Sequence, residues 1–510
     1  MVKKLLLIVA FLIFSILNYK FFESHIFNIH FVDEDENIVA GYYMGKGEKL
    51  YSDIFSHKQP IPAVVSNVLQ KIEKPNSLYL LIKRHRELVY SYSIIWSLII
   101  IVCFSVPGLI FSIFFEIIKQ YQLGNLFLSE SLVVFPSVFV LGVLWKILKG
   151  NKLLAVEYIL FSFSLVVIIF LQFTLILFSI AVLLLSLFQK KINKKIFLFY
   201  LLSFFALFIV CLPFVNYLKY FDNLINAIKS IYLGGSGADN PLNIFLYSFA
   251  RPFTILFYIN KSDFGKFLAI LSFGYIISFL YLFIYRKALR KILTISFVLL
   301  GLGSLRIVYP DKTFYEGFHG LPWLGLFLFL TMLQFYESIM LGKKLKTFLI
   351  ISSCIFLILL SNQGRNILKD YYLRFDRERD WYVNFSRFYD FGQTIRILSE
   401  KNDKIMVLPA EQLIYWQSGA PHATRFLYGY LFVNSDYKKE LYDYWKKSPP
   451  ALIYDEQNLA LFSSWTKDYI RLKREGNDTP LFMRKDKIGS IKDWQKNEIG
   501  RMKFSILNSN

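Results

Sequence analysis

Long apolar runs alternate with short polar stretches through the first two-thirds of the chain. A helix needs about 20 mostly apolar residues to span a bilayer, and it satisfies its own backbone hydrogen bonds there. The pattern therefore predicts a polytopic α-helical membrane protein with about 11 transmembrane helices. The predicted spans are 4–22, 88–106, 107–128, 131–148, 154–170, 171–189, 196–216, 265–285, 292–308, 321–340 and 347–361.

Two apolar runs, 88–128 and 154–189, are each long enough for two short helices. Pro107 and Gly108 interrupt the first run, and proline inside a helix removes a backbone hydrogen bond and clashes with the preceding turn. Gln172 is a polar residue within the second run. We therefore expect helix boundaries at Pro107-Gly108 and near Gln172.

Clusters of Lys and Arg test this helix count. They occur at Lys3-Lys4, at Lys149 with Lys152, and at 190–195, 286–291 and 343–346. With eleven spans and a cytoplasmic N-terminus, every cluster falls on the cytoplasmic side, as the positive-inside rule requires. The long polar segments then face outward, together with all six histidines; these segments are 23–87, 217–264, 309–320 and the tail from 362.

The polar tail predicts a second domain. Short runs typical of β-strands alternate there with helix-like stretches such as 391–402; these runs are 404–410, 413–416, 451–456 and 481–485. We expect residues 362–510 to form a small extracytoplasmic α/β domain. Residues 1–361 are expected to form the transmembrane module, with 23–87 as its first outer loop.

Composition and charge narrow the class of protein. The chain is 55% hydrophobic, and its net charge of +21 lies largely in short clusters between apolar runs. Lipid headgroups and topology explain such clusters, so we expect membrane lipids and no nucleic acid as partners. The three cysteines lie singly inside apolar runs, which predicts no disulfide framework. Abundant Lys, Ile and Phe indicate an AT-rich genome, and the lack of eukaryotic targeting signals favours a bacterial or archaeal plasma membrane.

The first outer loop begins with several acidic residues. Asp33 is a candidate helix N-cap, with Glu36 completing a capping box and Gly47 ending the helix. Ile38, Val39 and two tyrosines would then make an amphipathic helix on the membrane surface. This interpretation explains the acids without any catalysis.

A catalytic interpretation of the same acids also fits their position. A carboxylate partly shielded from water at the outer boundary can act as a general base. Sugar transfer to a hydroxyl needs such a base to take the acceptor proton. Asp33 and Glu34 are the candidate catalytic residues.

The spacing of the loop residues resembles a known family. An Asp-Glu pair follows the first helix, and behind it come a Gly, a Tyr-x-Asp and a His-Lys-x-Pro. The matching residues are Asp33, Glu34, Gly47, Tyr51, Asp53, His57, Lys58 and Pro60. The loop resembles the first outer loop of the GT-C superfamily of integral-membrane glycosyltransferases. That superfamily includes protein O-mannosyltransferases (glycosyltransferase family 39) and aminoarabinose transferases of lipid A.

The resemblance implies a fold and a mechanism. GT-C enzymes take a sugar from a polyprenyl-phosphate donor, and the anomeric centre inverts. By this resemblance Asp33 is the base, and Glu34 is either its neighbour in acceptor binding or its substitute. Tyr51 and His57 are assigned to the acceptor side. The acceptor, in the cell envelope, is left open among a protein side chain, a lipid and a growing glycan.

The donor phosphate needs cationic partners near the membrane. The candidates are Lys58, Arg84 and Arg86 of the sequence KRHR, and Arg251. Arg suits bidentate phosphate binding, and Lys acts as a point charge. The competing interpretation of KRHR is a set of basic residues that extend to lipid headgroups from a helix end.

Further polar residues are predicted on the outer side. Glu130 either orients the acceptor or holds a metal, or it belongs to a capping box around Ser129. His319, with Glu316, either lines the cavity or is an interfacial histidine beside Trp323. No metal ligand set is assigned and no cofactor is certain. The resemblance leaves a divalent ion (Mg or Mn) open, because parts of the superfamily need one and others do not.

Other functions were weighed against sugar transfer. Glu116 and Lys119 lie one turn apart in a predicted span, and such a pair is what a transporter or flippase of polyprenyl-linked glycans would use. An O-antigen ligase or polymerase-like protein is a third interpretation. The sequence has no P-loop, HExxH or CxxC motif, so nucleotide-dependent chemistry and zinc hydrolysis have no support.

Overall fold

A computed structural model describes most of the chain. The described residues are 2–188, 193–228, 241–258, 262–305, 314–340, 376–427, 435–456 and 466–506, with the single positions 360, 362 and 369. The chain divides into two compact units. We call Met1–Ile26, Arg86–Val210 and Asp239–Phe375 the helical unit, and Phe27–His85, Cys211–Ala238 and Asp376–Asn510 the mixed unit.

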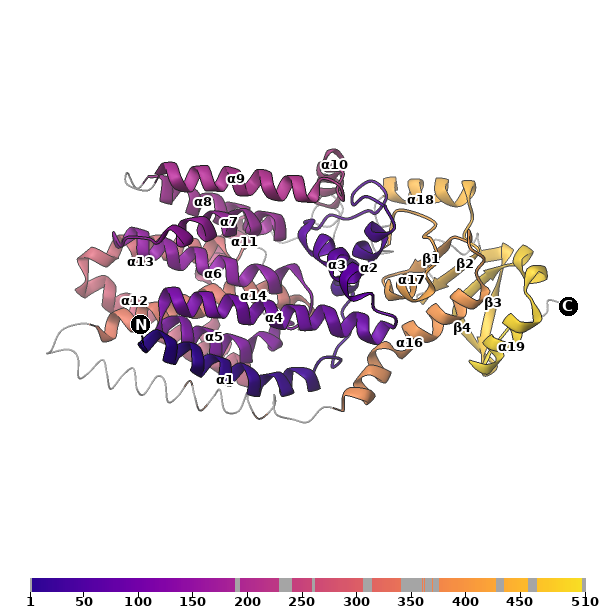
Figure 1. The fold of residues 1–510 in the computed structure, drawn as a ribbon, viewed down its shortest axis with the longest axis horizontal. Coiled ribbons are helices and arrows are strands. Elements are labelled where there is room, and N and C mark those ends of the chain that lie inside the picture. Colours follow the sequence, from indigo (N-terminus) through magenta and orange to yellow (C-terminus); the bar gives the residue numbers. More distant parts are fainter. Residues whose placement is uncertain are drawn as a thin grey trace. The chain divides into compact units, whose positions relative to one another are not determined.

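The helical unit consists of apolar helices (Figure 1). They are α1 (Val2–Ser24), α4 (Leu78–Phe104, which begins in the mixed unit), α5 (Val106–Ile118), α6 (Ser129–Leu148), α7 (Ala155–Leu171), α8 (Ile176–Leu187), α9 (Asn193–Cys211), α11 (Pro241–Thr254), α12 (Asp263–Tyr285), α13 (Arg290–Leu302) and α14 (Leu321–Ile339). Within the described residues, five helices are long and apolar enough to cross a membrane: α1, α4, α6, α12 and α14 with its preceding turn. Four shorter apolar helices accompany them. The chain is therefore a multi-pass helical membrane protein.

Both predicted helix breaks are confirmed. Helix α4 ends at Phe104 and α5 begins at Val106, because Ser105 adopts a positive φ of 56°. Helix α7 ends at Leu171, and a short 3-10 turn follows Gln172.

Three predicted spans extend at least five residues beyond the C-terminal ends of the α-helices that form. Their α-helices end at Ile118, Cys211 and Leu302. The cluster at 343–346, Cys354 and most of the last predicted span, 347–361, lie outside the described residues, as do residues 190–192.

Helices α6 and α14 form the centre of the helical unit. In each, 89% of the most apolar window is buried inside the protein, against 22% in α1. Gly325 of α14 allows close approach, because a Cβ there would lie 2.4 Å from a methyl carbon of Val134 in α6. Apolar side chains thus point both inward and outward, as expected for helices whose outer solvent is lipid.

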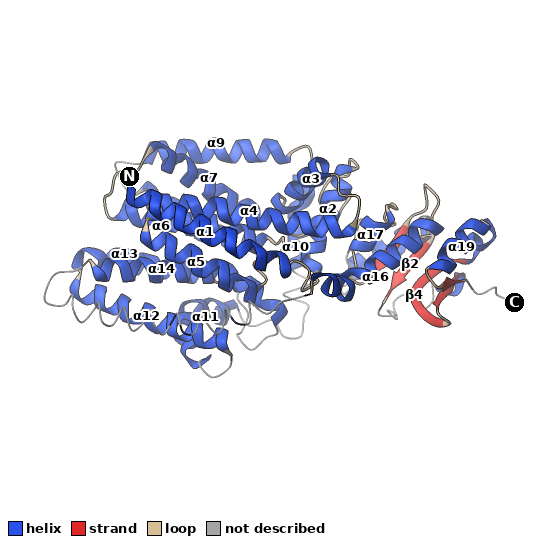
Figure 2. Cartoon of the chain, turned by 60° about the horizontal axis from the view of Figure 1, so that its bottom comes forward, coloured by secondary structure: helices blue, strands red, loops and turns tan. Residues whose placement is uncertain are grey.

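The mixed unit contains the predicted α/β domain (Figure 2). Its helices are α2 (Val32–Gly45), α3 (Ile61–Glu73), α10 (Tyr217–Ile228), α16 (Arg377–Leu398), α17 (Leu413–Ser418), α18 (Ser435–Lys447) and α19 (Asp493–Arg501). Its strands are β1 (Ile405–Leu408), β2 (Leu452–Asp455), β3 (Tyr469–Arg474), β4 (Asn477–Arg484) and β5 (Phe504–Ser505). The sheet order is β1-β2-β4-β3-β5, with β1 and β2 parallel and the other pairs antiparallel.

One strand prediction in this domain was wrong. Residues 413–416 form the start of helix α17 rather than a strand. Leu413, Ile414 and Tyr415 are all buried, and the hydroxyl of Tyr415 accepts the backbone N–H of Val407 in β1. Short apolar runs do not distinguish a strand from a buried helix, and here tertiary packing decided the outcome.

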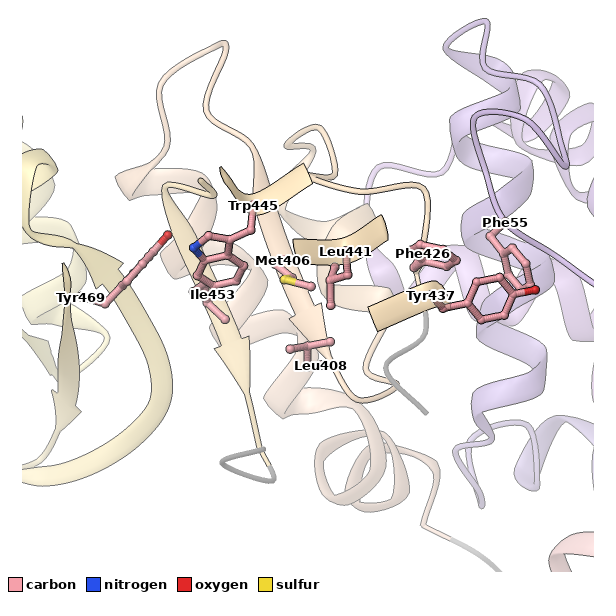
Figure 3. Packing of buried hydrophobic residues seen from close by; sticks show 9 residues of the cluster. All are labelled: Phe55, Met406, Leu408, Phe426, Tyr437, Leu441, Trp445, Ile453 and Tyr469. Atoms are coloured by element: carbon pink, nitrogen blue, oxygen red, sulfur yellow. The ribbon is translucent and has the colours of Figure 1, made fainter. Parts of the chain in front are cut away.

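The first loop shares a hydrophobic core with the C-terminal domain inside the mixed unit. Phe55 packs against Phe426 and Tyr437, with ring centroids 5.3 and 5.1 Å apart, beside Met406 and Leu408 of β1 (Figure 3). The compact unit therefore joins residues 27–85 to the tail, although sequence assigned them to the transmembrane module. The predicted boundary at 361–362 stays a prediction.

Helix α2 differs from the predicted surface helix. It begins at Val32 with Phe31 as its N-cap, so Asp33 lies in the first turn and not at the cap. Gly47 does follow the helix with a positive φ of 98°, as predicted. Residues 34–41 are all buried, so the helix is not amphipathic on a membrane surface. It packs against α3 and α17 within the mixed unit.

Replacing Gly41 of α2 with alanine should loosen the first loop. A Cβ at Gly41 would lie 2.6 Å from the Ser66 hydroxyl and 2.8 Å from the Asn67 backbone nitrogen in α3. Such overpacking typically costs about 1–3 kcal/mol. We expect Gly41→Ala to lower the denaturant concentration at which a protease cleaves residues 27–85 of the detergent-solubilised full chain. Gly500→Ala in α19 has open space around its Cβ and is the matched control. Equal protease resistance of both variants would contradict the tight α2–α3 crossing.

Candidate active site

A lysine joins two carboxylates at the start of α2. The ammonium group of Lys58 contacts Oδ1 of Asp33 and lies 2.6 Å from Oε2 of Glu36. Asp33 and Glu36 are three residues apart in the helix, so their side chains leave the same face. The Ser56 hydroxyl donates to the other oxygen of Glu36 at 2.9 Å, and the Lys58 backbone N–H donates to Ser56 at 3.1 Å. We call these four residues the Lys58 cluster.

Exposure distinguishes the two carboxylates of the Lys58 cluster. The Asp33 side chain is 24% exposed and that of Lys58 is 17% exposed, whereas Glu36 is only 3% exposed. Asp33 can therefore meet a substrate from solution, while Glu36 fixes the ammonium group from behind. Lys58 places one positive charge against both carboxylates.

Tyr51 holds the backbone that carries Lys58. It is fully buried with a positive φ of 80°, and its hydroxyl donates to the Lys58 carbonyl oxygen at 2.8 Å. Burial raises the pKa of the Tyr51 hydroxyl well above its ordinary value, so this group stays a neutral donor. Asn223 of α10 in turn donates to the Tyr51 carbonyl oxygen at 3.1 Å. The structure thus gives Tyr51 a positioning contact.

The other predicted residues of the first loop have separate places. Glu34 is completely buried in the first turn of α2. His57 is partly buried between Ser56 and Lys58. Arg84 pairs with Glu73 of α3 at 3.2 Å. Arg86 is buried in the helical unit, where it donates to the carbonyl oxygen of Ile26.

A second group of polar residues lies in the helical unit. Glu130, in the first turn of α6, accepts from Nδ1 of His319 at 3.1 Å and from the Gln172 amide at 3.5 Å. The sequence predicted Glu130 and His319 on the outer side of the membrane, which stays a prediction; the structure brings the two side chains together. Their roles stay predictions, and the Glu316 side chain lies outside the described residues.

Arg251 stacks on an aromatic ring at the start of α14. Its guanidinium carbon lies 4.8 Å from the centre of the Trp323 ring, and the Arg251 side chain is almost fully buried. Gly320 leaves room beside it, because a Cβ there would lie 3.5 Å from Nη2 of Arg251. A planar guanidinium placed in this way suits bidentate binding of an oxyanion.

One buried ion pair was predicted from the sequence, and other polar contacts were not. The predicted pairing of Glu116 with Lys119 is confirmed at 2.6 Å, and both side chains are buried. The sequence did not reveal that Asp35 pairs with His30 at 2.6 Å, nor that Glu36 and Ser56 join the Lys58 cluster. The three-residue spacing of Asp33 and Glu36 was the available signal, but it was interpreted as a capping box.

Within the described ranges, no group of three or more His, Cys, Asp or Glu side chains is arranged to hold a metal ion.

The carboxyl groups of Glu411 and Glu456 in the C-terminal domain predict that its stability depends on pH. Burial, followed by hydrogen bonding to Glu456, raises the pKa of Glu411 from its ordinary 4.5 to about 7, against the lowering effect of Arg387. Between pH 4.5 and about 7, Glu411 carries a proton in the folded protein but has lost it in the unfolded chain. This contribution to stability is complete below about pH 4.5 and is lost as the pH rises through about 7.

We therefore expect the free energy of local unfolding around β1 to fall between pH 4.5 and 7 in the wild-type protein. Glu411→Gln should flatten this dependence, while Glu498→Gln on the exposed face of α19 should leave it unchanged. Amide hydrogen exchange of residues 405–408, corrected for the intrinsic effect of pH, measures the slope. A wild-type slope that survives in Glu411→Gln would exclude Glu411 as its source.

The polytopic bundle with a small C-terminal α/β domain defines the class: the chain is a multi-pass helical membrane protein. A solved structure with this fold is the crystal structure of ArnT from Cupriavidus metallidurans in the apo state. The match has a TM-score of 0.54 at 10% sequence identity, and it covers 94% of this chain and 98% of that one. No family model matches the sequence, and no curated protein matches it either. The likeness is therefore one of fold.

Proposed function

We propose that this protein is an inverting glycosyltransferase. It moves a sugar from a polyprenyl-phosphate donor to an acceptor hydroxyl on the outer face of the plasma membrane. The observation that carries the proposal is the Lys58 cluster, in which one ammonium group holds two carboxylates and one of them, Asp33, reaches solvent. The likeness of the fold to that of ArnT supports the same reaction class.

Asp33 acts as the general base of the proposed reaction. Its carboxylate takes the proton of the acceptor hydroxyl while that oxygen bonds to the anomeric carbon of the sugar. The bond from this carbon to the phosphate oxygen breaks, and the polyprenyl phosphate leaves with the electron pair. One displacement from the opposite side inverts the anomeric centre. Lys58 lowers the cost of the two neighbouring negative charges.

Cationic side chains would neutralise the donor phosphate. Lys58 is a proposed ligand because it is partly exposed, although it already pairs with Asp33 and Glu36. Arg251 is proposed separately, because its guanidinium carbon lies over the Trp323 ring. Arg84 and Arg86 stay proposed as well: Arg84 pairs with Glu73, and Arg86 donates to a backbone carbonyl oxygen. Glu130 and His319 are proposed on the acceptor side. The N-terminus is proposed to be cytoplasmic and the mixed unit extracytoplasmic.

Reconstitution in liposomes tests the reaction. The full chain is incubated with a labelled polyprenyl-phosphate sugar and a mixture of protein, lipid and glycan acceptors, with and without a chelator. We expect label on an acceptor and an inverted anomeric configuration by NMR. Movement of intact donor between leaflets without any transfer would instead establish the flippase. Transfer of a whole preassembled glycan would establish the ligase or polymerase-like protein.

A further inference from the structure

A cavity of about 450 Å³ lies in the mixed unit, with Tyr51 in its wall. That volume falls in the usual range for small-molecule sites, about 300–1,000 Å³. Helix α10 supplies Lys219, Asp222 and Asn223 to its wall, and α18 supplies Glu440 and Tyr444. The cavity wall therefore combines hydrogen-bonding groups of both kinds with an aromatic side chain.

The charges in the cavity wall cancel. Lys219 and Arg425 face Asp222 and Glu440, so two positive groups meet two negative ones. Arg425 is already occupied: it donates to both oxygens of Glu440, at 2.6 and 2.8 Å, and to the Asn223 amide oxygen at 3.2 Å. A phosphate or carboxylate ligand would need uncompensated cations. The wall fits a neutral ligand with many hydroxyl groups better than an ion.

Next to the cavity, α10 exposes an apolar strip. Leu218, Phe221 and Ile225 are all exposed and share one face of the helix, while Asp222 and Lys219 occupy the adjoining face toward the cavity. Only residues 212–216 separate α10 from α9, an apolar helix of a multi-pass membrane protein. A helix with this pattern lies in the membrane interface with its apolar face in lipid. The cavity then opens at the level of the lipid headgroups.

We propose that the cavity binds a neutral saccharide, presented as the headgroup of a membrane lipid. Carboxylates of Asp222 and Glu440 accept from sugar hydroxyls, and the Lys219 ammonium donates to them. The partly exposed Tyr444 ring offers its face to the C–H side of a pyranose. Binding at this site requires no sugar transfer, so the proposal stands independently of the reaction at Asp33.

Tyr51 and Asn223 connect the cavity to the Lys58 cluster, and Asn223 donates to the Ser56 carbonyl oxygen at 3.4 Å. Tyr51 lines the cavity, accepts from Asn223 through its carbonyl oxygen, and donates to the Lys58 carbonyl oxygen through its hydroxyl. A saccharide that packs against α10 and Tyr51 should therefore restrain residues 51–58. This predicts that ligand binding slows amide exchange in the loop that carries Lys58.

Binding to the full chain in nanodiscs tests the proposal. The probes are a neutral diglucosyl diacylglycerol in the bilayer, the soluble methyl β-glucoside, and inorganic phosphate. Saturation-transfer NMR reports sugar contact, and hydrogen exchange reports residues 51–58 and 217–228. We expect the glycolipid to bind at least about tenfold more tightly than the soluble sugar, because anchoring raises its local concentration. Phosphate should not compete.

The variants separate this site from other surfaces. Tyr444→Ala and Asp222→Ala should each weaken glycolipid binding by about tenfold, which corresponds to about 1.4 kcal/mol. Tyr442→Ala is the matched control, because Tyr442 lies on the same helix and both tyrosines are 39% exposed. The side chains of Asp222 and Tyr444 are both exposed, so we expect both variants to keep the fold. Equal affinity for anchored and soluble sugar would overturn the headgroup assignment. Loss in Tyr442→Ala alone, or phosphate competition, would overturn the saccharide site.

Discussion

Asp33→Asn is expected to lower the rate of sugar transfer by about 10²–10⁴, which is the usual contribution of general-base catalysis. The amide has the size of the carboxylate and still offers an oxygen to Lys58, but it does not accept a proton from the acceptor hydroxyl. The change should appear in kcat, because the donor's contacts stay in place. Single-turnover transfer from a radiolabelled polyprenyl-phosphate sugar measures the rate of sugar transfer. Equilibrium binding of the same donor shows whether the variant keeps its donor site.

Two further variants serve as a control for Asp33→Asn and as a test of the alternative base. Asp478→Asn replaces an exposed acid of β4, far along the sheet from β1, and should leave transfer unchanged. Glu34→Gln tests the alternative base. Glu34 is completely buried, so its replacement should reduce stability more than kcat. Full transfer by Asp33→Asn, or loss confined to a well-folded Glu34→Gln, would remove Asp33 from the role of base.

Lys58→Gln is expected to reduce kcat/KM by at least about 10²-fold, because two nearby carboxylates lose the cation that compensates them. The Asp33 carboxylate would then lose the cation that it contacts, and its ionised form would lose that stabilisation. The acidic limb of the pH–rate profile should therefore move to higher pH. If Lys58 also binds the donor phosphate, the KM for the donor should rise as well.

Conservative replacement separates charge from shape at Lys58. Lys58→Arg keeps the positive charge, so its acidic limb should lie at the wild-type pH and not at that of Lys58→Gln. The guanidinium group is wider than the ammonium group, so we expect a poorer contact with Glu36. Lys46→Gln is the control, since Lys46 is exposed and donates to the backbone carbonyl oxygen of Gly419. An unchanged pH–rate profile in Lys58→Gln would show that this lysine does not control the ionisation of Asp33.

The membrane-spanning helices could be predicted from the sequence because every span in lipid must be a helix of about 20 mostly apolar residues. Apolar length marks helices such as α1, α6 and α12, and Pro107-Gly108 and Gln172 mark the breaks. Residues 413–416 were misassigned because four apolar residues have no period that separates strand from helix. Helix α2 was misplaced for a related reason: its acids suggested a surface, yet the fold buries Glu34, Asp35 and Glu36 in a helix that packs against α3 and α17.

The sequence by itself determined the class of protein, the helix breaks and the loop in which to look for a base, since hydropathy and residue spacing are local properties. Only the tertiary structure decided which charges meet. Glu36 joins Lys58 across 22 positions of sequence, and Arg425 joins Asn223 across a separation of 202. Such contacts depend on how a loop folds back, and no local pattern encodes that path. The cavity with Tyr51 in its wall exists for the same reason.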